Sequence, residues 1–137
     1  MMKNRIVPVL AILVIVFAVF LLNSCDLAIT KEQRISLFVD DLNQDPRPNS
    51  IRYNFSPSCA IYATLDGAFF STDFQTDSIP YSVYNLNLNA DPVTGTISGT
   101  GTGGTFGGPW SIEFTMVKDG LDWLILKLRL QGTTIVQ

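Results

Sequence analysis

The segment WSIEFTMVKDGLDWLILKLRL, residues 110–130, indicates the fold more clearly than any other part of the chain. Apolar residues occupy alternate positions before Asp119-Gly120, and leucines do so after it. Such alternation is typical of strands that bury one face, and an Asp-Gly pair between two of them predicts a tight hairpin turn. Trp123 and Ile125 are apolar on the opposite face of the second strand, so we expect both faces to be covered there.

A second hairpin is predicted around Asp66-Gly67. Residues 59–65 and 68–74 flank this pair and are rich in apolar and aromatic side chains. An Asp-Gly pair in that setting favours a two-residue turn between antiparallel strands.

Two further strands are predicted between these hairpins. Tyr84, Leu86 and Leu88 alternate with positions that are mostly asparagine, so we expect them on the buried face of one strand. Residues 94–103 predict the next strand. Seven glycines between residues 95 and 108 favour a flat or bulged edge strand that leads into a loop, although the threonines there also suit hydrogen bonds to a ligand or partner strand. The G-x-G-x-x-G match within this stretch has predicted strands on both sides, so we expect no dinucleotide site.

One helix is predicted ahead of the strands, over residues 31–43. Thr30 begins a T-x-x-Q capping box, and apolar residues follow at i, i+3, i+4 and i+7. Those four residues are Ile35, Phe38, Val39 and Leu42. Pro46 and Pro48 end the helix, and residues 49–55 favour a short turn or an edge segment. One helix followed by about six antiparallel strands defines an α+β domain over residues 30–137.

The N-terminal segment is typical of an exported protein. Of 137 residues, 47% are hydrophobic and only 15% are charged, and the apolar excess lies largely in residues 6–22, after the basic Lys3 and Arg5. This order of a basic stretch and an apolar run predicts a signal peptide over residues 1–24.

The end of this segment resembles the lipobox of bacterial lipoproteins. Leu22, Asn23 and Ser24 precede Cys25, with an aliphatic residue at minus three and a small residue at minus one, although Asn is less usual between them. The resemblance implies lipidation of Cys25, with acyl chains such as palmitate, on the extracytoplasmic side of a bacterial envelope membrane, inner or outer. An uncleaved membrane anchor and an ordinary cleaved signal are the alternatives. Residues 25–29 then form a short tether of at most about 17 Å, which places the first helix near the bilayer.

Residues 110–130 resemble the last hairpin of the nuclear-transport-factor-2-like domains. The sequence FVDDLNQD at residues 38–45 resembles the first helix of that family and its exit. That resemblance implies a cone-like barrel in which a curved sheet wraps the first helix and leaves a pocket at its open end. The family normally has two more helices where this chain has residues 43–58. A lipocalin-like barrel and a sandwich or novel arrangement are the alternatives. If the cone forms, the residues expected to line its pocket are Tyr62, Phe70, Asp73, Tyr84, Trp110 and Trp123.

Charge and residue content exclude several function classes. After residue 24 there are seven basic residues against twelve acidic ones, a net charge of −5, and such a domain is poorly suited to nucleic acid. Histidine is absent, so we expect no metal, no cofactor and no His-dependent catalysis. Asp66, Asp73 and Asp77 lack the spacing of a calcium loop. Cys59 is expected to be a small buried hydrophobe, with intermolecular pairing as the alternative.

These features favour a non-catalytic binding module, tethered to the membrane, whose partner is an envelope protein or a small apolar ligand. The alternatives are a small isomerase- or dehydratase-like enzyme, in which Asp73 acts with Tyr62 or Tyr84, and a purely structural envelope protein. A deep pocket with a buried Asp that faces aromatic rings favours the enzyme. A filled core with an unpaired strand edge favours a partner protein.

Overall fold

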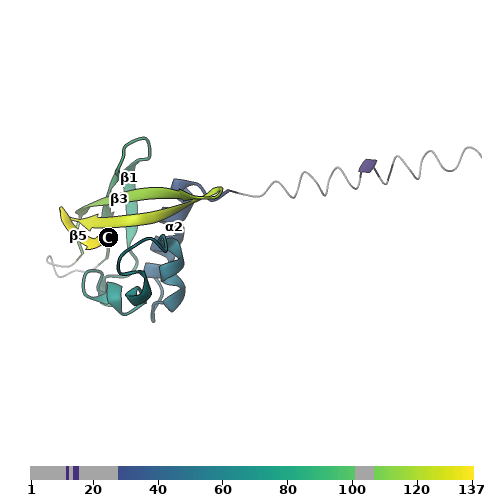
Figure 1. Cartoon of the computed structure of the whole chain (residues 1–137). Helices are drawn as coiled ribbons and strands as arrows, with labels where there is room; N and C mark the ends of the chain where they lie inside the picture. The colour runs from purple at the N-terminus through teal and green to yellow at the C-terminus, as the bar shows by residue number, and fades with distance from the viewer. Residues whose placement is uncertain (1–11, 13, 16–27, 101–106) are drawn as a thin grey trace, which may run out of the picture.

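The computed structural model describes residues 12, 14, 15, 28–100 and 107–137. Residues 28–100 and 107–137 form an α+β domain with one α-helix and one antiparallel sheet (Figure 1). The elements are α2 (Lys31–Leu42), β1 (Ser82–Asn87), β2 (Val93–Ser98), β3 (Trp110–Asp119), β4 (Asp122–Leu130) and β5 (Thr133–Val136). No helix in the described part of the chain has the length and apolarity needed to cross a bilayer.

The sheet is an open meander of five strands. Its spatial order, β1-β2-β3-β4-β5, is the order along the chain, so β1 and β5 are the two edges. We expected about six strands in a cone-like barrel; the described residues form five strands in an open sheet, in which β1 and β5 do not pair with each other. The expected edge strand at residues 94–103 is wrong as well, because β2 pairs with β1 on one side and β3 on the other.

The predicted hairpin of residues 110–130 is confirmed as β3 and β4, the long hairpin that crosses the molecule in Figure 1. Its turn lies one residue later than expected, because Asp119 pairs with Asp122 and the loop is Gly120 and Leu121. A register shift between Thr115 and Met116 leaves Leu126 without a partner. The bulge interrupts the leucine alternation, so Ile125 before it and Leu128 after it both enter the core.

The strand β5 was missed, although its turn carries a signal. Gln131 and Gly132 both have positive φ, 51° and 77°, as a two-residue type I′ hairpin turn requires. Because Gln is an unusual residue for the first of these positions, the pair does not stand out in the sequence.

The predicted hairpin of residues 59–74 is wrong. These residues form the short 3-10 turns η2 (Tyr62–Thr64) and η3 (Phe69–Ser71). The Asp66 carboxylate accepts a hydrogen bond from the Phe69 N–H at 2.8 Å, which begins a helical turn and not a strand. Gly67 has a packing role, because a Cβ there would lie 2.1 Å from the Arg47 carbonyl oxygen.

The helix α2 is confirmed, and it organises the core. In its capping box the Gln33 N–H donates to the Thr30 hydroxyl at 3.2 Å, and the Thr30 N–H donates to the Gln33 side chain at 2.9 Å. Phe38 is fully buried at the centre of an aromatic cluster. Its ring makes edge contacts with four others, at centroid distances of 5.4 to 6.4 Å. Those partners are Phe55, Phe70, Phe74 and Phe114.

Short 3-10 turns complete the domain beside the helix. The first, η1 (Asn49–Asn54), confirms the expected turn after the two prolines, and η4 (Thr76–Ser78) leads into β1. Phe55 forms an isolated bridge with Ile125, and the Ser56 N–H donates to the Ile125 carbonyl at 2.8 Å. This segment therefore lies alongside the first half of β4.

Candidate functional site

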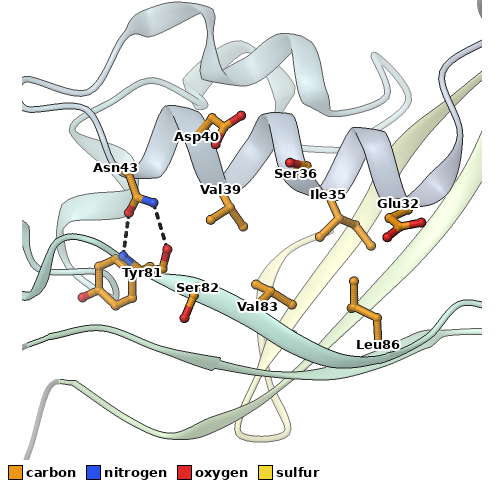
Figure 2. Close-up of a pocket in the computed structure, with 10 residues that line it drawn as sticks. All are labelled: Glu32, Ile35, Ser36, Val39, Asp40, Asn43, Tyr81, Ser82, Val83 and Leu86. Atoms are coloured by element: carbon orange, nitrogen blue, oxygen red, sulfur yellow. Dashed lines mark hydrogen bonds between the residues drawn. The ribbon is translucent and has the colours of Figure 1, made fainter.

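The helix α2 runs antiparallel along the free edge of β1 and is attached to that region at both ends. At the helix start, the Lys31 ammonium lies 3.4 Å from the Leu88 carbonyl, just beyond the end of the strand. At the helix end, Asn43 is bonded to Tyr81, immediately before the strand begins (Figure 2). The middle of the helix and the middle of the strand have a groove between them.

Asn43 connects the two elements through its side-chain amide. It is the C-cap residue of the helix, and its own N–H donates the last regular helical hydrogen bond, to the Val39 carbonyl at 3.0 Å. Its amide nitrogen donates to the Tyr81 carbonyl at 2.8 Å, and its amide oxygen accepts from the Tyr81 N–H at 2.6 Å. The amide thus gives Tyr81 the pair of hydrogen bonds that a neighbouring strand would supply. The edge of β1 beyond Tyr81 has no such partner among the described strands.

The groove has a volume of about 310 Å³, at the small end of the range for ligand sites. Figure 2 shows Ile35 and Val39 of the helix directed toward Val83 and Leu86 of the strand. Ile35 is buried, whereas the other three are half-buried. The polar residues around these four are Glu32, Ser36, Asp40, Asn43 and Ser82. An apolar floor with a polar rim suits a ligand that has both kinds of group.

A bulge in β1 creates this floor. Tyr84 pairs with Thr96 and Asn87 pairs with Thr94, so two residues of β1 lie opposite Gly95. Asn85 adopts φ 55°, a left-handed conformation that Asn tolerates better than most residues. Leu86 then lies over Gly95, where a Cβ would come within 2.8 Å of the leucine Cδ2.

The bulge corrects the expected alternation in this strand. Val83 and Leu86, three positions apart, line the groove together, whereas Tyr84 is 41% exposed. Tyr84 therefore does not lie on a buried face, as the regular period of two predicted.

The rim of the groove is acidic. The Glu32 and Asp40 side chains are exposed and lie on the helix side of the groove. No basic residue lines it among the described residues. Together with the net charge of −5 after residue 24, this favours a ligand that carries positive charge.

The six residues expected to line a pocket are spread over the domain. Phe70 is fully buried in the aromatic cluster, and Tyr62 packs against the core from η2. Trp110 begins β3 and Trp123 is the second residue of β4, so the antiparallel register separates them along the hairpin. None of the six lines the groove between α2 and β1 in the described part of the chain.

Asp73 and the tyrosines do not form a bonded acid–phenol pair in the described residues. Asp73 is half-buried, and burial raises the pKa of its carboxyl group. No hydrogen bond joins it to Tyr62 or Tyr84 in residues 28–100. No group of three potential metal ligands gathers in the described residues either.

The remaining candidate residues lie either in the core or outside the described residues. Leu22, Asn23, Ser24 and Cys25 lie outside the described residues, as do residues 101–104 of the G-x-G-x-x-G match. Cys59 is 5% exposed, which confirms the expected buried thiol. Burial raises its pKa, and its Sγ donates to the Leu126 carbonyl at 3.0 Å.

Sequence reasoning found the apolar face of α2 but not the groove. Ile35 and Val39 were expected to be core residues, while Glu32, Asp40 and Asn43 carried no signal for a site. Comparison of the chain with family models, curated proteins and solved structures gave no match.

Proposed function

We propose that the chain is a lipoprotein of the bacterial cell envelope whose domain binds an extended segment of another envelope protein. Lipid on Cys25 holds the domain on the extracytoplasmic side of a membrane, as the signal peptide and the lipobox resemblance imply. The domain then acts by binding, without a catalytic step.

The free edge of β1 beside the groove carries this proposal. An edge strand offers unpaired N–H and C=O groups, and an added strand gains affinity from them while its alternate side chains enter pockets. The helix α2 provides such a pocket beside the edge, between Ile35, Val39, Val83 and Leu86. Asn43 already occupies the edge position at Tyr81, so the added strand pairs from Ser82 onward.

The groove defines the chemistry of the segment. Its four apolar side chains accept a short aliphatic or aromatic side chain, and Glu32 and Asp40 favour a Lys or Arg next to it. A small apolar ligand is the second candidate, because a volume of about 310 Å³ reaches the lower limit for such sites. The open strand edge favours the peptide.

The core argues for binding over catalysis. An isomerase- or dehydratase-like enzyme requires a cavity in which an Asp faces a Tyr. Instead, four buried phenylalanine rings surround the buried ring of Phe38 between helix and sheet. A purely structural envelope role has no particular observation in its favour.

Membership of the nuclear-transport-factor-2-like class stays part of the proposal. The α+β architecture, the helix packed on the sheet and the long hairpin support it. The open meander order counts against a closed cone.

Two experiments test the proposed function. Cys25→Ala is expected to abolish acyl labelling of the full chain, and retained labelling would exclude lipidation at this residue.

For binding, an extended peptide that alternates Val with Lys is compared with one in which Glu replaces every Lys. We expect the Lys peptide to bind about tenfold more tightly, because each rim carboxylate changes from attraction to repulsion.

The location of the bound peptide is read from amide hydrogen exchange. Protection is expected to rise in Ser82–Asn87, and Val39→Arg is expected to remove it by blocking the groove. Thr133→Arg, on the opposite edge strand, is the matched control and should leave protection unchanged. Equal binding of both peptides, or protection on β5 instead of β1, would exclude this groove as the site.

A further inference from the structure

The turn of the β3–β4 hairpin presents an apolar side chain to solvent. Gly120 adopts φ 62°, and Leu121 follows it with its side chain 61% exposed. A glycine with positive φ at the first loop position is typical of a type II′ turn, in which the second residue needs no special conformation. The sequence therefore places a leucine where turns normally have polar residues.

This hairpin tip is bonded to the start of the described domain. The Trp123 N–H donates to the Ile29 carbonyl at 3.0 Å, and the Ile29 N–H donates to the Asp122 carboxylate at 2.9 Å. In Figure 1 the tip lies beside the purple segment that leads into the domain. Ile29 is four residues after Cys25, so their Cα atoms are at most about 14 Å apart. If Cys25 carries lipid, as the proposed function holds, the point to which the tip is bonded lies within that reach of the anchor.

The side chains around the tip are those that proteins place at a membrane surface. The Lys31 ammonium lies 4.5 Å from the centre of the Trp123 ring, and the Lys118 ammonium lies 5.8 Å from it. Trp favours the headgroup level of a bilayer, and Lys can bury its stem there while its charge stays in water. Asp119 and Asp122 offset the two ammonium charges, so the attraction is apolar more than electrostatic.

We propose that Leu121 and Trp123 form a second membrane contact, in which the hairpin tip enters the headgroup region of the bilayer that holds the lipidated Cys25. The acyl chains on Cys25 hold the protein at the membrane through a short tether, and a second contact would also fix the orientation of the domain. Because α2 begins at this tip, the groove along β1 extends from Glu32 near the bilayer to Asn43 farther from it. The contact thus directs the groove toward partners in the envelope space.

The opposite end of β4 offers a matched control. Its turn, Gln131 and Gly132, is exposed like the tip but carries no apolar side chain. Leu121→Cys and Thr133→Cys place one exposed labelling site at each end of the strand. Lipidation blocks the Cys25 thiol, and Cys59 is buried, so a nitroxide reagent reacts at the introduced cysteine.

The experiment uses the full lipidated chain in vesicles of phosphatidylethanolamine and phosphatidylglycerol. Collisions of the nitroxide with a water-soluble nickel complex are expected to fall on reconstitution for the label at 121 and to stay unchanged for the label at 133. The fall should persist in phosphatidylcholine vesicles, because the contact is apolar. If the collision rate at residue 121 falls only when the anionic lipid is present, the contact is not made by apolar insertion.

A second measurement avoids replacing Leu121 by a label. In a Trp110→Phe background, lipids brominated near the headgroup are expected to quench Trp123 fluorescence, and Leu121→Asp is expected to remove the quenching without unfolding the domain. Mass spectrometry of the same samples reports acylation. Acylated protein with unquenched Trp123 and a water-exposed label at 121 would reject the membrane contact while the lipid anchor stands. Absent acylation would reject the anchor itself.

Discussion

The Asn43 side chain pairs with both backbone groups of Tyr81, at 2.8 Å and 2.6 Å, and so joins the end of α2 to the start of β1. The amide of this C-cap residue thereby occupies the first position of a strand edge. The remainder of that edge faces the groove, so in the binding mode proposed above this pair would set where an added strand begins.

Asn43→Ala is expected to lower the free energy of unfolding by about 1–3 kcal/mol, because Tyr81 N–H and C=O both lose partners near the core. Asn43→Asp keeps the acceptor for the Tyr81 N–H but sets a carboxylate oxygen against the Tyr81 carbonyl at the C-terminal end of the helix, so it is also expected to be destabilising. Urea denaturation measures both. Gln44→Ala, at the exposed next position, is the control and should be nearly neutral. Equal stability of all four proteins would show that the pair does not support the domain.

Gly95→Ala is expected to displace Leu86 from the groove, because the new Cβ would lie 2.8 Å from its Cδ2. Overpacking of this kind costs about 1–3 kcal/mol. The double variant Gly95→Ala/Leu86→Ala lacks this clash. It should therefore be more stable than the summed stability losses of the two single variants predict. A thermal-unfolding cycle over the four proteins measures this coupling. Additive costs would contradict the contact.

The sequence predicted the elements that depend on local chemistry. Thr30 and Gln33 form the expected capping box, and Gly120 lies in the turn of the expected hairpin. The prediction failed where one local sequence signal is compatible with two different structures. Asp66-Gly67 has the composition of a hairpin turn, but there the carboxylate caps a 3-10 turn and the glycine packs on Arg47.

The groove was not predictable for a related reason. A period of two in the sequence assumes a regular strand, whereas the bulge at Asn85 brings Val83 and Leu86 to one side. Bulges depend on pairing with a neighbouring strand, here at Gly95, and that pairing is not local in the sequence. The same holds for Asn43, whose partner Tyr81 is 38 residues away.

Asp73→Asn is expected to stabilise the domain near neutral pH. Burial raises the pKa of Asp73 in the folded state, so the folded chain binds its proton more tightly than the unfolded chain does. Stability is therefore lost as the pH rises from the ordinary value of 3.8 through the folded pKa. Below 3.8 the advantage of Asn should vanish. Urea unfolding at both pH values measures it, with the exposed Asp91→Asn as control. An advantage that is independent of pH would exclude the carboxylate charge as its cause.

Cys59 is expected to be unreactive in the folded protein and to support the bulge of β4. Its thiol donates to the carbonyl of Leu126, the bulged residue, at 3.0 Å, while the adjacent Ile125 carbonyl accepts from the Ser56 N–H at 2.8 Å. Burial raises the pKa of the thiol, and the thiolate is the reactive form, so alkylation should require unfolding.

Cys59 variants separate the hydrogen bond from the packing. Cys59→Ser retains a donor for Leu126 but places a hydroxyl in an apolar site, whereas Cys59→Ala removes the donor and leaves a small void. We expect each to cost about 1–2 kcal/mol, because each loses one of the two contributions. Measured in a Cys25→Ala background, where Cys59 is the only thiol, rapid alkylation of the native protein or a disulfide-linked dimer would show that this thiol is accessible and favour intermolecular pairing instead.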